Sequence, residues 1–417
     1  MTEREPLILA SPDKLVGKQQ AHVIMILFGL ASLLPWNMFI TATGYFQGKF
    51  NATESETIII NFPSYLQIGG IVSNVVLSMS SMIIIRYVRI PHLINLSNTI
   101  MLAGFIFTTF LTKINTDSWA VTFFVLTNVV FCIMSALTAL YVSSMMAMAS
   151  MMPPHSIKGF FLGQALAGLF ATCLSIITLS IPGANTDDAG FYYFLIASLT
   201  LSASLMLYVV FRKMPYVRFY LEKGEESSSL ESEKLDCEVV EKLTLFQLFR
   251  ATQKYSLASF FALLYTLVMF PAVMSRLKST GPDGRWSETY FLPVIVFLGF
   301  NVGDVCGRIS SSFLRWPGKN LILWVSIARV IFIPLLLMCN LQPRAIAVWF
   351  TSDIFALVLI FLFGWSNGHI LSLSVSYAPQ DVVGDINKAS IGTIQAFSCS
   401  CGLVVGSCLV FAVVSII

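Results

Sequence analysis

The stretch FLGFNVGDVCGR, residues 297–308, places an aspartate and an arginine inside an otherwise apolar segment. Asp304 and Arg308 are four residues apart, so a helix brings both side chains to one face. Ionisable groups are costly inside a membrane, and those that occur there face a bundle interior or a water-filled path and pair with each other. The stretch therefore predicts a membrane-spanning helix in a bundle, with a transport pathway beside the pair.

The composition extends this interpretation to the whole chain. Of the 417 residues, 56% are hydrophobic and 11% are charged, whereas a soluble domain carries about 25% charged residues. Helices satisfy their own backbone polar groups in lipid, so we expect an all-α membrane protein. Eleven segments are long enough to cross about 30 Å of hydrocarbon, namely residues 20–43, 61–85, 92–112, 119–149, 159–181, 190–211, 253–275, 290–313, 321–340, 352–375 and 390–415.

A polar insertion divides these spans into two groups. Residues 214–250 include charged and serine-rich stretches, a composition that cannot bury a core and is typical of disorder. A 6+5 layout favours a two-bundle transporter like those of the major facilitator architecture. We therefore expect four parts: a cytosolic tail at 1–19, a six-span N-terminal bundle at 20–213, a disordered cytosolic linker at 214–250, and a five-span C-terminal bundle at 251–417.

The distribution of positive charge predicts the orientation in the membrane. With a cytosolic N-terminus, 17 of the 25 Lys and Arg residues lie on the cytosolic side and six on the opposite side. Cytosolic loops normally carry such an excess, so we expect the N-terminus in the cytosol and the C-terminus outside the cell or in a lumen. Asn51, in the sequon Asn51-Ala52-Thr53, then lies in an outward loop as a glycosylation candidate.

The N-terminal tail contains a pattern that resembles a sorting signal. Glu3 precedes Leu7-Ile8 by four residues, a spacing that resembles the dileucine signals read by adaptor proteins of endosomes and lysosomes. A chance match in a short tail is the alternative interpretation. The pattern therefore leaves two locations open, a lysosomal or endosomal membrane and the plasma membrane.

Several classes of function are disfavoured. The short polar loops leave no room for a catalytic domain, and the chain has no P-loop, dinucleotide-binding fingerprint or zincin motif. The eight cysteines form no CxxC pair in a soluble loop, so we expect no zinc site. We expect no enzyme, no metal, no cofactor and no nucleic-acid partner. A channel is also disfavoured because no repeated pore helix is visible, whereas a receptor or scaffold that binds without translocating stays open.

Four stretches, in order along both halves, carry a resemblance to a known family. The chain resembles the equilibrative nucleoside transporters, solute carrier family 29. That resemblance implies facilitative transport of nucleosides by alternating access, with nucleobases and stimulation by acidic pH as further possibilities. A carrier of another small solute, such as an organic cation, is the alternative. The matching stretches are LLPWN at 33–37, GQALAG at 163–168, FNVGDVCGR at 300–308, and SNG at 366–368 followed by Ala378-Pro379.

The resemblance also implies a substrate site. A nucleoside has a stackable base and a ribose rich in hydroxyls, which suit an aromatic wall and a few hydrogen-bonding groups. Asp304 and Arg308 would hold the ribose, although a purely structural ion pair is the alternative. We expect six lining residues: Trp36, Ile40, Ser144, Asn301, Asp304 and Arg308. Weaker candidates for the cavity or its gates are Asn37, Gln164, Phe270 and Phe297, and Gly163 and Gly168 are expected to allow close helix packing.

One position departs from the best-known plasma-membrane members. Those members carry a glutamine in the fourth span that helps to hold the base, and here Val142 stands in its place within Tyr141-Val142-Ser143-Ser144. This version looks more like the intracellular, lysosomal branch of the family. Two further polar residues lie within spans. Arg329, before Pro334, is a candidate for an inward path, and His369 is expected to be a hydrogen-bonded histidine rather than a proton carrier.

Overall fold

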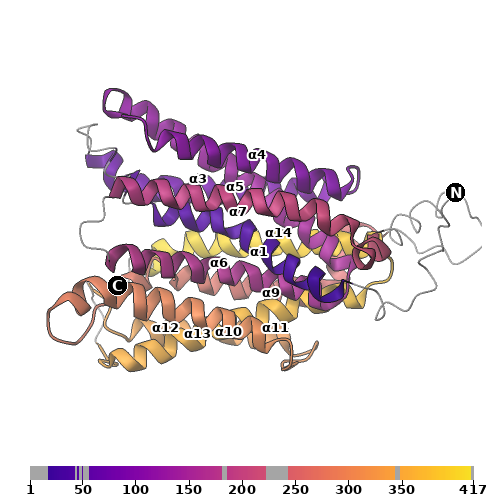
Figure 1. The fold of residues 1–417 in the computed structure, drawn as a ribbon. Helices are drawn as coiled ribbons and strands as arrows, with labels where there is room; N and C mark the ends of the chain where they lie inside the picture. The colour runs from indigo at the N-terminus through magenta and orange to yellow at the C-terminus, as the bar shows by residue number, and fades with distance from the viewer. Residues whose placement is uncertain are drawn as a thin grey trace, which may run out of the picture.

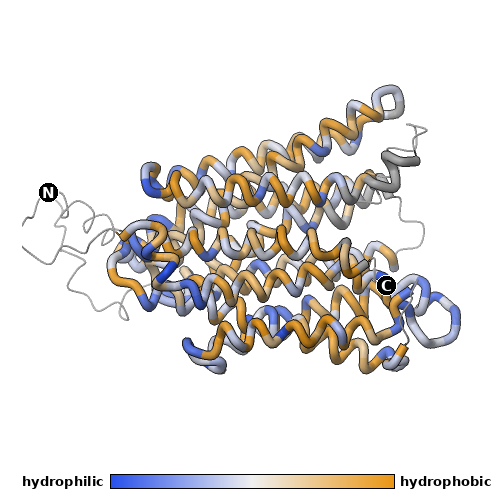
Figure 2. Tube along the Cα trace, turned by 180° about the vertical axis from the view of Figure 1, so that it is seen from behind, coloured by the Kyte–Doolittle hydropathy of each residue, from blue (hydrophilic) through white to orange (hydrophobic). Residues whose placement is uncertain are grey.

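The fold is a bundle of long apolar helices. The computed structural model describes residues 17–42, 45–46, 49, 56–180, 186–221, 243–342 and 348–414. Within these ranges, ten helices are long and apolar enough to cross a membrane, and Ile322–Leu337 forms a shorter apolar one. Figure 2 shows apolar residues along the helices and hydrophilic residues gathered toward their ends. The predicted all-α fold with eleven spans is confirmed.

The first six spans form the N-terminal bundle, drawn from indigo to magenta in Figure 1. Within it, α1 packs on α6 and α7, while α5 packs on α3 and α4 and α4 also contacts α7. The six helices are α1 (Lys18–Thr41), α3 (Glu56–Ile84), α4 (Ile90–Leu111), α5 (Ala120–Met151), α6 (Pro154–Ser180) and α7 (Thr186–Lys213).

The last five spans form the C-terminal bundle, in which α9 packs on α13 and α14 and α10 packs on α13. Its elements are α9 (Leu245–Met269), η6 (Trp286–Tyr290), η7 (Leu292–Leu298), α10 (Gly299–Ser310), α11 (Ile322–Ala328), η8 (Arg329–Ile331), α12 (Phe332–Leu337), α13 (Asp353–Tyr377) and α14 (Asp385–Val414). A capping box of Thr244 and Gln247 starts α9, and residues 215–221 are helical. The part of the predicted linker outside the described residues is therefore 222–242.

Two spans of the C-terminal bundle are irregular, which the hydropathy pattern does not reveal. The eighth begins as two stretches of π-helix, η6 and η7, before it becomes α10. The ninth is interrupted by the 3₁₀ turn η8. Pro293 lies at the start of η7, and Pro334 lies in α12, in the turn after η8. Each proline lacks the N–H that would bond the carbonyl four residues earlier. The regular hydrogen-bond ladder cannot continue through these turns.

The two bundles meet through two helices, α14 and α6, each of which packs on two helices of the other bundle. α14 packs against α3 and α5, and α6 packs against α10 and α13. α1 begins at one end of the molecule and α14 ends at the opposite end, as an odd number of spans requires (Figure 1). The pairing of α6 with α10 brings the charged stretch of residues 300–308 to the junction of the bundles.

Candidate substrate site

The centre of the candidate site is the pair Asp304–Arg308 on α10. The Nε of Arg308 donates to Oδ2 of Asp304 at 2.9 Å, as the i,i+4 spacing requires. Asp304 is 5% exposed and Arg308 is 7% exposed, so neither charge is open to solvent in this conformation. A charge buried to this degree is retained only when it is paired and hydrogen-bonded.

A polar network continues from Asp304 into the C-terminal bundle. Asn367 on α13 donates to Oδ1 of Asp304 at 2.7 Å and accepts from the Thr266 hydroxyl of α9 at 2.9 Å. Arg329 donates to the same hydroxyl at 3.2 Å. The Asp304 network is thus the chain Arg308, Asp304, Asn367, Thr266 and Arg329. It joins α9, α10, α13 and η8 through one carboxylate and two guanidinium groups.

Glycines allow the helices of this network to lie close together. A Cβ atom on Gly303 of α10 would lie 2.3 Å from the Phe361 carbonyl oxygen of α13, and one on Gly364 would lie 2.3 Å from the Phe300 carbonyl oxygen. Neither helix could keep this distance with a larger side chain at either position. The short bond from Asn367 to Asp304 depends on this approach.

Arg308 also reaches across to the N-terminal bundle. Its Nη1 donates to the Phe161 carbonyl oxygen of α6, and its guanidinium lies 5.6 Å from the centre of the Phe161 ring. Three more hydrogen bonds join α6 to the eighth span: Lys158 to the Ser311 carbonyl at 2.6 Å, Asn301 to the Thr172 hydroxyl at 2.9 Å, and Tyr290 to Ser180 at 3.3 Å. We call these four contacts the α6–α10 seam.

The predicted residues of the N-terminal bundle make contacts of their own. The half-buried ring of Trp36 lies 5.0 Å from the Phe131 ring of α5, and a Cβ atom on Gly70 of α3 would lie 2.8 Å from it. Gln164 of α6 donates to Ser32 of α1 at 3.3 Å, and Asn37 donates to the Leu33 carbonyl at 2.9 Å. No hydrogen bond or ring contact among the described residues joins Trp36 to the Asp304 network.

Ser144 and Ile40 are the least defined of the predicted lining residues. Ser144 is fully buried in α5, and its hydroxyl has no hydrogen-bond partner in the described part of the chain. An unpaired buried hydroxyl costs free energy, so this group is available to a solute that reaches it. Ile40 belongs to α1, but its side chain lies outside the described residues.

The phenylalanine candidates belong to an aromatic cluster of the C-terminal bundle. The ring of Phe270 stacks on that of Phe300 at 4.1 Å and meets the ring of Phe297 edge-on at 5.5 Å. The Phe297 carbonyl accepts the second hydrogen bond of Asn301, at 2.9 Å. Phe297 and Phe300 lie on η7 and α10, and Phe270 follows the last residue of α9, so the cluster joins these spans next to the polar residues of the α6–α10 seam.

Gly163 and Gly168 lie at two different contacts of α6. A Cβ atom on Gly163 would lie 1.9 Å from the Ile26 carbonyl oxygen of α1, inside the N-terminal bundle. One on Gly168 would lie 2.5 Å from Oδ1 of Asn301, across the α6–α10 seam. The first glycine therefore sets the spacing of α1 and α6, and the second leaves room for the Asn301 amide.

Sequence reasoning gave no role to two groups that hold the pair, the Asn367 side chain and the Phe161 carbonyl. Asn367 lies in a matched motif, but its bond to Asp304 depends on how α13 packs, and the Phe161 contact uses a backbone carbonyl that any residue has. Arg329 lies in the C-terminal bundle, where it also donates to the Ala262 carbonyl at 2.7 Å. Both ring nitrogens of His369 are bonded, to Ser310 at 2.7 Å and to the Trp316 carbonyl at 2.6 Å.

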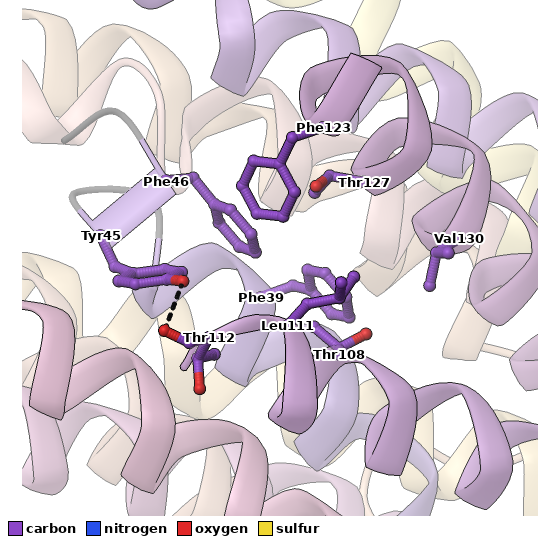
Figure 3. A pocket seen from close by; sticks show the side chains of 9 residues that line it. All are labelled: Phe39, Tyr45, Phe46, Thr108, Leu111, Thr112, Phe123, Thr127 and Val130. Carbon is purple, nitrogen blue, oxygen red and sulfur yellow. Dashed lines mark hydrogen bonds between the residues drawn. The ribbon is translucent and has the colours of Figure 1, made fainter. Parts of the chain in front are cut away.

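Two cavities differ in size and position. One of about 430 Å³ lies where the bundles meet, lined by the end of α5, the start of α6, the end of α13 and the start of α14. Lys388 and Tyr220 are ionisable side chains in its lining. The other, in Figure 3, is an aromatic-lined void of about 10 Å³ inside the N-terminal bundle, across which the Tyr45 hydroxyl donates to the Thr112 carbonyl. About one water fills such a void, so it cannot hold a nucleoside-sized solute.

Four sequence candidates lie outside the described residues: Asn51, Glu3, Leu7 and Ile8. The sequon and the sorting pattern therefore stay predictions from sequence.

The family follows from comparison with known proteins. A family model described as "Nucleoside transporter" matches residues 126–415. The chain belongs to this family. Rat equilibrative nucleoside transporter 3 is 26% identical over 93% of this chain and 87% of its own length. Human equilibrative nucleoside transporters 1 and 2 are 26% and 24% identical, over 93% and 94% of this chain and 95% and 96% of their own lengths. The predicted membership of the equilibrative nucleoside transporter family is confirmed.

The fold has a counterpart among solved structures. The major facilitator superfamily proton:xylose symporter XylE, bound to 6-bromo-6-deoxy-D-glucose, matches with a TM-score of 0.61. The two chains are 12% identical, and the match covers 93% of this chain and 86% of that one. At this identity the match establishes the fold alone, and it confirms the predicted major-facilitator-like arrangement of two bundles in this nucleoside transporter family member.

Proposed function

We propose that this chain carries nucleosides across a membrane, down their concentration gradient, by alternating access of its two bundles. The observation that best supports this is the buried pair Asp304–Arg308, because Arg308 also bonds Phe161 of the opposite bundle. A solute that takes over these bonds changes the contact between the bundles, so binding is coupled to their movement. The most similar curated relatives named above are equilibrative nucleoside transporters, and the chain aligns with most of their length.

The proposed site combines groups from both bundles. Asp304 accepts hydrogen bonds from ribose hydroxyls and Arg308 donates to them. The Trp36 ring stacks on the base with its N–H as a donor, and Asn301 bonds a base edge. Ile40 and Ser144 complete the lining, with Asn37, Gln164, Phe270 and Phe297 around it. Val142 provides no polar group, so base recognition relies on Ser144 and on Asn301.

An organic cation is a less suitable substrate. Both carboxylate oxygens of Asp304 already accept hydrogen bonds, one from Arg308 and one from Asn367. A second guanidinium, that of Arg329, lies at the far end of the same network. A cation entering here would meet positive charge in a medium that screens it poorly. A neutral nucleoside meets no such repulsion.

Uptake into proteoliposomes tests the proposal. Purified full-length protein is reconstituted, and initial uptake of labelled adenosine and uridine is measured at symmetric neutral pH and with an acidic donor side. Saturable uptake that unlabelled nucleosides inhibit and an organic cation does not would support it. Folded protein that moves neither nucleoside under either condition would contradict it. The acidic arm tests acid stimulation separately, and unlabelled nucleobases used as competitors test the wider substrate range.

The seam yields a further prediction. Thr172→Val keeps the shape of the side chain but removes the hydroxyl that accepts from Asn301 across the bundles. One such hydrogen bond contributes about 1 kcal/mol, so we expect the ratio of the two access states to change about fivefold and the maximal uptake rate to change severalfold without being lost. Initial rates over a range of substrate concentrations measure this.

The matched control is Thr200→Val, which removes a hydroxyl bonded within α7, to the Ile196 carbonyl at 2.8 Å. We expect this variant to transport like the unaltered chain. Equal rates in the two variants would show that the bond between the bundles has no part in the cycle.

We further propose a lysosomal or endosomal membrane as the location, with the N-terminus in the cytosol, the C-terminus in the lumen and Asn51 glycosylated. The excess of Lys and Arg on the cytosolic side supports the orientation. The pattern of Glu3, Leu7 and Ile8 supports recognition by adaptor proteins in the cytosol. Replacement of the usual glutamine by Val142 agrees with the intracellular branch that the sequence resembles.

Removing the sorting pattern is expected to move the protein. With Leu7→Ala and Ile8→Ala together, full-length protein expressed in cultured cells should shift from lysosomes to the plasma membrane, as measured by microscopy and surface biotinylation. Leu15→Ala with Val16→Ala is the control, because this apolar pair has a serine four positions before it. An unchanged distribution of the first variant would exclude the signal.

A further inference from the structure

A second pocket lies outside the transport route, at one end of the N-terminal bundle. It has a volume of about 400 Å³ and lies between the first turns of α4 and the last turns of α7. Three of its six lining residues are cations and none is acidic. The residues are Asn95, Tyr208, Val209, Arg212, Lys213 and Arg218. The lining therefore offers concentrated positive charge to an anion.

The pocket opens beside apolar surface. On the two helices that form it, Leu96 is 54% exposed, Met206 72% and Val210 55%. In a protein of this hydropathy, such side chains face the hydrocarbon of the bilayer. Arg212 and Lys213, at the end of α7, are themselves exposed. Positive charge thus lies at the end of a membrane-spanning helix, directly beside lipid-facing surface.

We propose that this pocket binds the headgroup of an anionic phospholipid. Guanidinium groups bond phosphate oxygens in pairs, and Lys adds a compact charge. The adjacent apolar faces of α4 and α7 accommodate the acyl chains, which a soluble phosphate lacks. Under the proposed orientation, the pocket lies in the cytosolic leaflet, where anionic lipids are concentrated.

The pocket wall also includes a polar group without a partner. Tyr208 is fully buried, and its hydroxyl has no hydrogen-bond partner in the described part of the chain. The ring packs 6.0 Å from that of Phe28 on α1. A headgroup seated between Arg212 and Lys213 therefore contacts a wall that is fixed to the centre of the bundle. Its binding should stabilise the bundle, because a ligand that binds only the folded state raises stability.

Thermal unfolding of the purified full-length protein in a neutral detergent tests the proposal. The probes are dioctanoyl phosphatidylglycerol, dioctanoyl phosphatidylcholine and inorganic phosphate. We expect the anionic lipid alone to raise the unfolding temperature in a saturable way. In the double variant Arg212→Gln with Lys213→Gln, the lipid concentration for half-maximal stabilisation should rise at least about tenfold, because each cation near the surface contributes about fivefold.

The control removes two exposed cations of the C-terminal bundle, Arg250→Gln with Arg315→Gln. It should respond to the lipid like the unaltered chain. Equal responses to phosphatidylglycerol and phosphatidylcholine would overturn the proposal, as would an equal loss of response in the control variant. If inorganic phosphate alone raised the unfolding temperature at the same concentrations, the ligand would be a soluble anion, and the proposal of a lipid ligand would be overturned.

Discussion

Asp304→Asn is expected to lower the initial rate of nucleoside uptake at least about a hundredfold. The amide has nearly the shape of the carboxylate, but it leaves Arg308, which is 7% exposed, without its counter-charge. Breaking a buried, hydrogen-bonded charge pair costs about 3 kcal/mol or more, which corresponds to about a hundredfold in rate when the lost interaction acts in the transition between states. Uptake of labelled adenosine into proteoliposomes measures the effect.

Two further variants separate the site from the fold. Asp283→Asn changes an exposed aspartate outside the bundles and should leave uptake unchanged. Asp304→Asn with Arg308→Met removes both charges of the pair, so Arg308 does not stay buried without its counter-charge, and this protein should be more stable than Asp304→Asn alone. Arg329 keeps its hydrogen bonds to the Ala262 and Phe363 carbonyls in both variants. The double variant should still fail to transport. Transport by the folded double variant would mean that the pair is a structural contact and does not hold the substrate.

Gly163→Ala is expected to cost about 3 kcal/mol or more of folding stability, at the upper end of what overpacking costs. The new Cβ atom would lie 1.9 Å from the Ile26 carbonyl oxygen and 2.7 Å from the Leu30 nitrogen. Both are backbone atoms, so a side-chain rotation cannot relieve the overlap and α1 must move away from α6. Thermal unfolding of the purified protein should begin at a clearly lower temperature, with a lower yield of folded protein.

Gly284→Ala is the matched control, because an added Cβ atom there would meet no atom within 4 Å. The same chemical change should then have little effect on unfolding. If the two variants unfold at the same temperature, the contact between α1 and α6 is looser than the structure indicates. Gly168→Ala should lower the unfolding temperature less than Gly163→Ala and more than Gly284→Ala. The atom nearest to its added Cβ is the side-chain oxygen of Asn301, which can rotate away.

The spans could be predicted from sequence because length and hydropathy are local properties. All eleven expected segments correspond to apolar helical stretches, and most ends differ by a few residues, although the seventh begins at Leu245 and was expected at residue 253. Hydropathy could not predict where a span departs from regular α-helix. Pro293 and Pro334 signal an interruption, but they do not say whether the chain widens to a π-helix, as in η7, or tightens to a 3₁₀ turn, as in η8.

The site could be predicted only within one helix. The i,i+4 spacing gave the bond between Asp304 and Arg308, and the helical repeat put Asn301 on nearly the same face. Contacts between helices could not be predicted from sequence, because they depend on the close packing that glycines such as Gly303 allow. Asn367 was visible as a polar residue in an apolar span, yet only the close approach of α13 to α10 makes it a partner of Asp304.

The α6–α10 seam has a regular order. Along α6, the contacts at Lys158, Phe161, Thr172 and Ser180 meet Ser311, Arg308, Asn301 and Tyr290 in turn. The two segments therefore run antiparallel, and their hydrogen bonds are spread along the length of α6, from its first turns to its last residue. A tilt that opens one end breaks the bonds there and keeps the others. The bonds of Tyr290 and Asn301 join neutral groups, so losing both costs about 1–3 kcal/mol, whereas the bonds of Arg308 and Lys158 have charged donors and cost about 1.5–3 kcal/mol each. Opening at the Tyr290 end therefore meets the smaller barrier.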